Sequence, residues 1–153
     1  MNKIDQLELR AAFFLTLARA FAIPSEPGFH AAMRDNLVGE LEELGRACGY
    51  TVTDQCVALD DALRHGDAQS LLVSYSRLFL TPGAQHPSLN TGSYIDGALA
   101  GGSVNAMETC YQRCGLTKDA SFADLPDHVT TQFEFVAWLY AAEAEADAAG
   151  GTP

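Results

Sequence analysis

The apolar positions of this 153-residue chain recur at helical spacing over most of its length. In residues 3–22 one stripe of apolar side chains repeats every three or four positions, and a second stripe runs beside it. A helix with two such stripes must be covered on more than one side. Asn2 is the expected N-cap, and Asp5 stands three residues later, where it can complete a capping box. The pattern therefore predicts a packed N-terminal helix.

Four further helices are predicted from apolar spacing and from residues that favour helix ends. They are expected over residues 26–48, 54–65, 68–81 and 104–114. The predicted N-caps are Ser25, Thr53 and Asp67, and the predicted stop residues are Gly49, Gly66 and Gly115. Alternation of apolar and polar residues, which is typical of strands, is missing from the sequence. With the last helix described below, we expect an all-α, single-domain bundle of about six helices.

The last predicted helix follows Leu125-Pro126-Asp127-His128. Asp124 is a plausible N-cap, Pro126 suits an early helical position, and Asp127 adds negative charge at the positive end of the helix dipole. One broad apolar face follows, so we expect this helix to be deeply packed. That face consists of Val129, Phe133, Phe135, Val136, Trp138, Leu139, Tyr140 and Ala144. Asp127 and His128 are then expected at the mouth of a core helix, where a carboxylate and an imidazole can meet a ligand.

Between the fourth and fifth helices the composition changes to Pro, Gly, Ser, Asn and Thr. This stretch, from Pro82 to about Gly102, contains too many glycines and prolines for a long regular element. Loops of this length inside a compact domain are uncommon and are usually functional. We therefore expect the loop to be a second candidate binding surface.

The formal net charge of −11 and only nine Lys and Arg residues argue against nucleic-acid binding, which needs clustered positive charge. Since no Lys or Arg follows Lys118, the C-terminal part is especially acidic, which suits a basic partner or serves solubility alone. No apolar run approaches the roughly 20 residues of a membrane-spanning helix, and the N-terminus lacks a signal-peptide pattern. We expect a cytosolic protein.

Few residues suggest chemistry. Cys110 and Cys114 are four apart on one predicted helix, but no further ligand completes a metal set, so buried reduced thiols are favoured and no metal or other cofactor is predicted. Asp127 and His128 could form an acid-base pair, yet a serine nucleophile or nucleotide-binding loop is not visible. A helix-start carboxylate and a histidine bonded to the backbone are simpler readings. His30, His65 and His86 are expected in surface or structural roles.

Four motifs in order nevertheless resemble one known family. They are Tyr75-Ser76-Arg77-Leu78-Phe79, Gly92-Ser93-Tyr94-Ile95-Asp96, Tyr111 ahead of Gly115-Leu116, and Leu125-Pro126-Asp127-His128 followed by Phe133-Glu134-Phe135. This set is similar to the TorD/DmsD family of cytoplasmic chaperones that mature molybdenum-containing redox enzymes. The resemblance implies an all-helical fold, no catalytic turnover, and recognition of the twin-arginine signal peptide and apoprotein of a partner enzyme before cofactor insertion and export.

The resemblance also implies peptide-binding residues. Asp127 and His128 match the family's Asp-His pair, Pro126 belongs to the same motif, and Ser93 matches the loop that lines the groove. A carboxylate can bind paired arginines, while Tyr75, Leu78 and Tyr94 can hold the hydrophobic part of a signal peptide.

The family pattern continues through further helices, whereas this sequence reaches an Ala/Glu tail. We therefore expect residues 1–149 to form a TorD/DmsD-like chaperone domain without the family's C-terminal helices, and residues 150–153 to be a flexible tail. The broad apolar face of the last helix then predicts a homo-oligomer. Exchange of a segment between two chains is one way in which it could form. Two other functions stay open: a small acid-base enzyme using Asp127 and His128, and a helical accessory subunit of a reductase.

Overall fold

The computed structural model describes residues 1–81, 86–117, 119 and 124–150. The described residues form helices and no strand, which confirms the predicted all-α class. The helices are α1 (Lys3–Ala20), α2 (Phe29–Ala32), α3 (Val38–Ala47), α4 (Thr53–His65), α5 (Ala68–Tyr75), α6 (Gly92–Ile95), α7 (Gly102–Arg113) and α8 (Val129–Ala148). Two π-helical segments, η1 (Met33–Leu37) and η2 (Ser76–Leu80), join α2 to α3 and extend α5. The described part thus has seven continuous helices, and the short α6 is the one not predicted.

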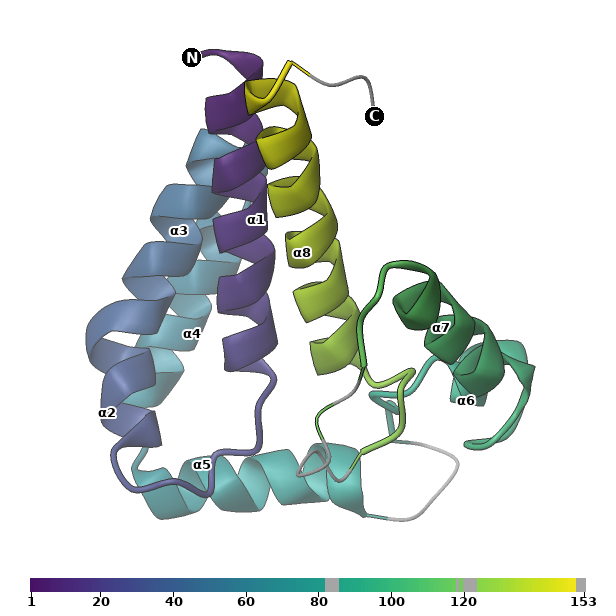
Figure 1. Ribbon diagram of the computed structural model, residues 1–153. Helices are drawn as coiled ribbons and strands as arrows, with labels where there is room; N and C mark the ends of the chain where they lie inside the picture. The colour runs from purple at the N-terminus through teal and green to yellow at the C-terminus, as the bar shows by residue number, and fades with distance from the viewer. Residues whose placement is uncertain (82–85, 118, 120–123, 151–153) are drawn as a thin grey trace.

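The first and last helices pack side by side and run antiparallel, so that the start of α1 lies beside the end of α8 (Figure 1). Phe14 of α1 contacts Phe133 and Tyr140 of α8, with ring centroids 5.9 Å apart in each pair. Near the chain ends, Lys3 Nζ lies 3.0 Å from Glu143 Oε1 and 2.8 Å from Asp147 Oδ2. Because Lys3 is exposed, these ion pairs are screened by solvent and stabilise little, so the aromatic contacts contribute more to holding the two helices together.

The main core lies on the other side of α1, against α3 and α4. Its buried members are Phe13, Met33, Leu37, Val38, Leu41, Cys56 and Leu63. The two apolar stripes of α1 are explained by this arrangement, because one faces α8 and the other faces this core. Capping fixes where α1 begins: Asn2 and Asp5 form the predicted capping box.

Helix α5 lies across the lower ends of α1 and α2, and α6 and α7 form a separate projection beside the lower end of α8 (Figure 1). The Tyr75 hydroxyl donates to the Phe21 carbonyl at 3.1 Å, which ties the end of α5 to the end of α1. The ring of Tyr111 on α7 meets Phe135 of α8 edge-on at 4.9 Å. A concave corner therefore forms where α5, α6 and α8 approach one another.

Several predicted helix boundaries are confirmed and others are wrong. Asp67 caps α5 as predicted, and its side chain accepts the Ser70 N–H at 2.7 Å. Ser25 is not an N-cap, because the second helix begins at Phe29, after Gly28 in a left-handed conformation. Thr53 is the first residue of α4 rather than its cap, which is Val52.

The start of the last helix is the most consequential correction. Its N-cap is His128, not Asp124, so Pro126 and Asp127 precede the helix instead of forming its first turn. The predicted deep packing holds for only part of its apolar face, since Trp138 and Leu139 are 37% and 43% exposed. Of the predicted tail, residues 151–153 lie outside the described residues. No helix in the described part is both long and apolar enough to cross a bilayer.

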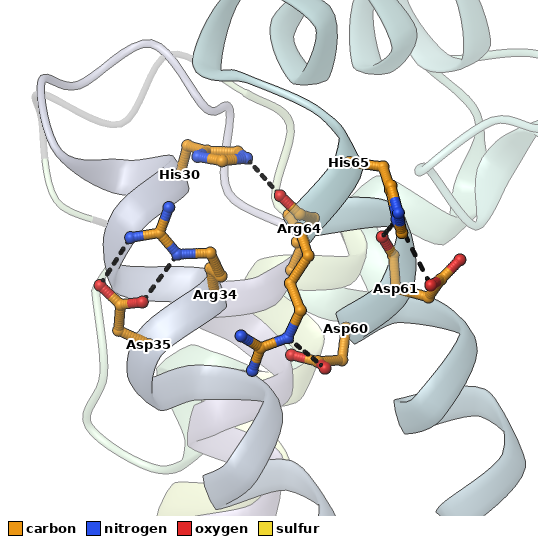
Figure 2. A network of polar contacts seen from close by, with 8 residues as sticks. His30, Arg34, Asp35, Asp60, Asp61, Arg64 and His65 are labelled. Carbon is orange, nitrogen blue, oxygen red and sulfur yellow. Dashed lines mark hydrogen bonds and ion pairs between the residues drawn. The ribbon is translucent and has the colours of Figure 1, made fainter.

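Polar side chains gather at the surface of the core where α2 and η1 lie beside the end of α4, and the contact of His30 with Leu63 joins α2 to α4 (Figure 2). His30 Nε2 lies 3.0 Å from the Leu63 carbonyl, and His65 Nδ1 lies 2.8 Å from that of Asp61. The Arg34 guanidinium bonds to Asp35 and holds the pKa of that carboxyl below its ordinary value. The expected structural and surface roles of His30 and His65 are therefore confirmed.

Candidate functional site

The long loop and the segment before α8 meet through backbone hydrogen bonds. Asn90 and His128 form an isolated antiparallel bridge. On either side of it, Val129 N donates to the Leu89 carbonyl at 2.7 Å and Thr91 N donates to the Asp127 carbonyl at 3.2 Å. Two stretches that are far apart in the sequence are thereby held in fixed register, and the two segments predicted from the sequence to be binding surfaces lie side by side.

Asp127 lies behind this junction and is fully buried, with 0% of its surface exposed. Its Oδ2 accepts the Gly92 N–H at 2.7 Å, and its Oδ1 accepts the side-chain amide of Asn90 at 3.0 Å. The Gln132 amide, from the first turn of α8, donates to the Asp127 carbonyl at 2.6 Å and also to the Thr91 hydroxyl. The Asp127 carboxylate is thus not presented to a ligand, although direct pairing with arginine was expected from the sequence.

His128 sits at the edge between interior and cleft. Its Nδ1 accepts the Thr130 N–H at 3.2 Å, so the imidazole caps α8. Only 7% of the residue is exposed, and burial lowers the pKa of the imidazole below its ordinary value, against the opposing charges of Asp124 and Asp127. The neutral ring is favoured, and a neutral Nδ1 is what the cap requires.

Pro126 is buried and anchored from a different helix. The Tyr111 hydroxyl donates to the Pro126 carbonyl at 2.7 Å, and burial raises the pKa of that hydroxyl to about 12. Tyr111 therefore stays a neutral donor over the physiological range. Helix α7 is joined to the Pro126–His128 segment by this bond.

Helix α6 forms one wall of the site. The Tyr94 hydroxyl donates to the Ser88 carbonyl at 2.9 Å, and the Ser93 hydroxyl bonds to that of Ser88 at 2.8 Å. At the far end of the wall, Asp96 Oδ2 accepts the Ser103 N–H at 2.8 Å. The loop is thus ordered by its own hydrogen bonds in its described part, and Tyr94 stays 67% exposed.

These elements enclose a cleft of about 660 Å³. Apolar and polar side chains from η2, the loop, α6 and the start of α8 line it. The lining residues are Phe79, Leu80, Thr81, His86, Pro87, Ser88, Leu89, Asn90, Ser93, Tyr94, Gly97, Leu99, Asp124 and His128. Such a mixed surface suits an extended peptide with apolar and polar side chains better than a small polar metabolite.

The residues predicted from the sequence take different places around this cleft. Ser93, Tyr94 and His128 line it. Pro126 and Asp127 are buried behind it and hold its walls. Tyr75 is also buried, with its hydroxyl on Phe21, and Leu78 lines a separate shallow hollow with Ser74, Arg77 and His86.

Several contributors were missed from the sequence. Asn90 and Gln132 hold Asp127, and Leu80 and Leu99 supply exposed apolar surface to the cleft. A spacing of three or four residues in a sequence indicates only contacts within one helix. The contact between Asn90 and Asp127 could not be found in this way, because the two residues are 37 positions apart. Leu80 could have been suspected, since an apolar side chain followed by Thr-Pro-Gly at the end of a helix tends to be exposed.

The two cysteines of α7 do not form a site. Cys110 is exposed, so the expectation of a buried thiol there was wrong, and Cys114 is partly buried. Among the described residues, no group of three His, Cys, Asp or Glu side chains is arranged to hold a metal ion.

Fold and site together define an all-α domain in which a buried carboxylate holds a loop beside a mixed apolar and polar cleft. Comparison with known proteins makes the class specific. The chain belongs to the nitrate reductase delta subunit family, whose sequence model matches residues 47–152. This is a non-catalytic family of chaperones for redox enzymes, so the TorD/DmsD-type resemblance is confirmed and the acid-base enzyme is excluded.

A solved structure supports the fold. A crystal structure from Archaeoglobus fulgidus, described as a "putative redox enzyme maturation protein", superimposes with a TM-score of 0.56 at 18% identity and covers 90% of each chain. At this identity the likeness concerns the fold alone. No curated protein matches the chain significantly.

Proposed function

We propose that this chaperone binds the twin-arginine signal peptide and the apoprotein of a molybdenum-containing oxidoreductase in the cytoplasm, and assists cofactor insertion before export. In this proposal residues 1–149 act as one chaperone domain. The observation that carries it is the cleft between η2, α6 and the start of α8, in a chain of the redox-enzyme chaperone family. The cofactor belongs to the partner enzyme.

The chemistry of the cleft fits such a peptide, which combines paired arginines with an apolar stretch. Leu80, Tyr94 and Leu99 are 54%, 67% and 57% exposed and offer apolar surface to that stretch. Asp124 contributes a carboxylate to the lining, and the net charge of −11 attracts a basic peptide from a distance. Affinity is expected from the apolar contacts, and orientation from the charges.

Calorimetric titration with a synthetic twin-arginine signal peptide tests this proposal. We expect saturable binding to the wild-type chain that weakens when both arginines are replaced by alanine. Leu99→Ala should weaken binding about fivefold, because roughly 1 kcal/mol of apolar contact is lost. The matched control is Val57→Ala on α4, a residue that is equally exposed at 60% but does not line the cleft, and it should bind as the wild type does. Equal affinity for the two peptides would refute the proposal.

A second candidate is a helical accessory subunit that stays with the mature enzyme. The name of the family, nitrate reductase delta subunit, favours it. Affinity purification from cells separates the two functions. A chaperone should recover the precursor with its signal peptide attached, whereas an accessory subunit should recover the processed, cofactor-loaded enzyme.

We also propose that the chain self-associates through the outer face of α8. Trp138 and Leu139 are exposed there, and the Trp138 ring stacks on Phe135 with centroids 6.2 Å apart, so that aromatic surface faces solvent. Light scattering at micromolar concentration should give a mass above that of one chain, and Trp138→Glu should return the mass to that of a monomer. A monomeric wild-type mass would refute this proposal.

A further inference from the structure

The Asp127 carboxylate already has its hydrogen-bond partners within the chain. Both of its oxygens accept hydrogen bonds from the loop, from the Gly92 amide at 2.7 Å and the Asn90 side chain at 3.0 Å. Hydrogen bonds to an ionised acceptor are among the strong ones in proteins. The residue is 0% exposed and does not line the cleft. A bound arginine could reach it only by displacing the loop residues that it holds.

The backbone of Asp127 holds the same stretch of loop. Its carbonyl accepts the Thr91 N–H at 3.2 Å, and Gln132 donates both to that carbonyl and to the Thr91 hydroxyl. Gly92 allows the close approach, since a Cβ there would lie 3.1 Å from Asp127 Oδ2 and 2.7 Å from the Ala98 carbonyl oxygen. One residue therefore fixes three consecutive loop residues, 90–92.

The wall of the cleft follows directly from these three residues. Asn90 lines the cleft itself, and Gly92 is the first residue of α6, which carries Ser93 and Tyr94 into the cleft. At the other end of the wall, Asp96 holds the Ser103 amide. Without the hydrogen bonds from residues 90–92 to Asp127, the side of the wall that faces α8 would no longer be held in place.

We infer that Asp127 is a positioning residue, which sets the cleft wall formed by Asn90, Ser93 and Tyr94 without touching the bound peptide. This inference rests on the proposed peptide-binding function and changes the role given to the carboxylate within it. Its charge serves the hydrogen bonds to the loop, and the peptide meets the residues that line the cleft.

Asn90→Asp separates positioning from direct attraction because the two roles predict opposite results. The substitution places a second carboxylate against Asp127, where like charges repel, and it also adds negative charge to the lining of the cleft. If Asp127 attracts arginines directly, added negative charge leaves peptide binding unchanged or tightens it. If Asp127 positions the wall, Asn90→Asp should weaken binding by about tenfold, the cost of one lost charge-assisted hydrogen bond.

Asp127→Asn supplies the complementary variant. The new amide oxygen can accept the Gly92 N–H, and its NH₂ can donate to the side-chain oxygen at position 90 once the Asn90 amide turns over. Positioning therefore predicts a loss of less than about threefold for Asp127→Asn alone. It also predicts that Asp127→Asn restores binding in the Asn90→Asp background, because the same bond re-forms with donor and acceptor exchanged. Direct attraction predicts a large loss in both backgrounds.

The experiment titrates the wild-type chain and these three variants with the twin-arginine peptide and records their thermal unfolding. Weak binding by Asn90→Asp with recovery in the double variant supports the inference. Tight binding by Asn90→Asp, or loss of binding with Asp127→Asn in both backgrounds, overturns it. If Asn90→Asp does not fold, Asp127→Asn alone decides, since retained binding supports positioning and lost binding refutes it.

Hydrogen exchange at the Gly92 amide keeps this inference distinct from the proposed function. If the wild-type chain binds no peptide, the proposed function fails, and exchange then decides the positioning role. Protection that falls in Asn90→Asp and returns in the double variant supports it. Equal protection in all four proteins overturns it.

Discussion

The hydrogen bond from Tyr111 to Pro126 offers a test of how the site is held together. The phenol of Tyr111, on α7, donates to the Pro126 carbonyl at 2.7 Å, and both residues are buried. Tyr111→Phe removes the hydroxyl while the ring keeps its edge-on contact with Phe135 at 4.9 Å. The substitution therefore isolates the bond that joins α7 to the segment before α8.

The expected cost follows from burial. A hydrogen bond between neutral groups contributes about 1 kcal/mol net, and a buried carbonyl left without its donor costs about 1–3 kcal/mol. We expect Tyr111→Phe to lower the free energy of unfolding by about 2 kcal/mol, which for a chain of this size is a fall of about 6 °C in melting temperature.

The pH dependence gives a second signature. Burial raises the pKa of the Tyr111 hydroxyl from 10.0 to about 12, so the unfolded chain loses this proton before the folded chain does. Ionisation therefore favours the unfolded state as the pH rises from 10 towards 12, and the wild type loses the contribution of Tyr111 over that window. The variant has no proton to lose at this position. The stability difference between the two proteins should accordingly shrink above pH 10.

Urea unfolding at neutral and at alkaline pH measures both effects. The matched control is Tyr50→Phe, because Tyr50 is 38% exposed and its hydroxyl makes no hydrogen bond within the described part of the chain. It should change stability by less than about 0.5 kcal/mol. If Tyr111→Phe is as stable as this control at neutral pH, the bond to Pro126 contributes nothing and the reasoning is refuted.

Five more substitutions, at four positions, test other parts of the structure. His128→Ala should cost about 1 kcal/mol through loss of the α8 cap, whereas His128→Asn should keep the cap. Burial lowers the pKa of His128, so the unfolded chain binds the proton more tightly and the wild type loses stability as the pH falls below 6.5. His128→Asn should remove this loss of stability. Gly92→Ala should destabilise by at least about 1 kcal/mol because its Cβ would meet backbone, whereas Gly39→Ala, in an open helical position, should stabilise slightly. Leu63→Ala should cost about 3 kcal/mol by opening a cavity in the core. Chemical denaturation measures each change, and a cost for Gly39→Ala equal to that for Gly92→Ala would contradict the packing argument.

The helices were predictable where local signals and packing agree. Asn2 and Asp67 were found as caps because each has a partner three residues later, and a capping box depends only on such a spacing. Ser25 and Thr53 have equally good cap chemistry but were wrong, because the chain enters the helices through Gly28 and Val52. A cap residue signals a possible start, and the path of the preceding backbone decides whether it is used.

The cleft was only partly predictable. The loop and Asp127-His128 were identified as binding surfaces from composition and from a resemblance in motif order, and the structure places them together. The wall that α6 forms was not predicted, because a four-residue helix has no periodicity to detect. Tyr75 was predicted to hold the hydrophobic part of a signal peptide, yet the residue is buried and its hydroxyl donates to the Phe21 carbonyl at the end of α1. Which partner an aromatic hydroxyl meets depends on tertiary packing.

The changed role of Asp127 follows from one displaced helix start. With Asp124 as cap, Asp127 would lie in the first turn of the helix, pointing outward with its charge available to a ligand. Because His128 caps α8 instead, the residue before it lies in a turn beside the loop, and its side chain accepts hydrogen bonds from donors 35 and 37 residues away. The start of α8 therefore decides the role of Asp127. With the helix starting one turn earlier, the carboxylate would be available to a partner, whereas in this structure it holds the wall of the cleft. In the proposed function, the Asp-His motif is therefore required for peptide binding although its aspartate does not contact the peptide.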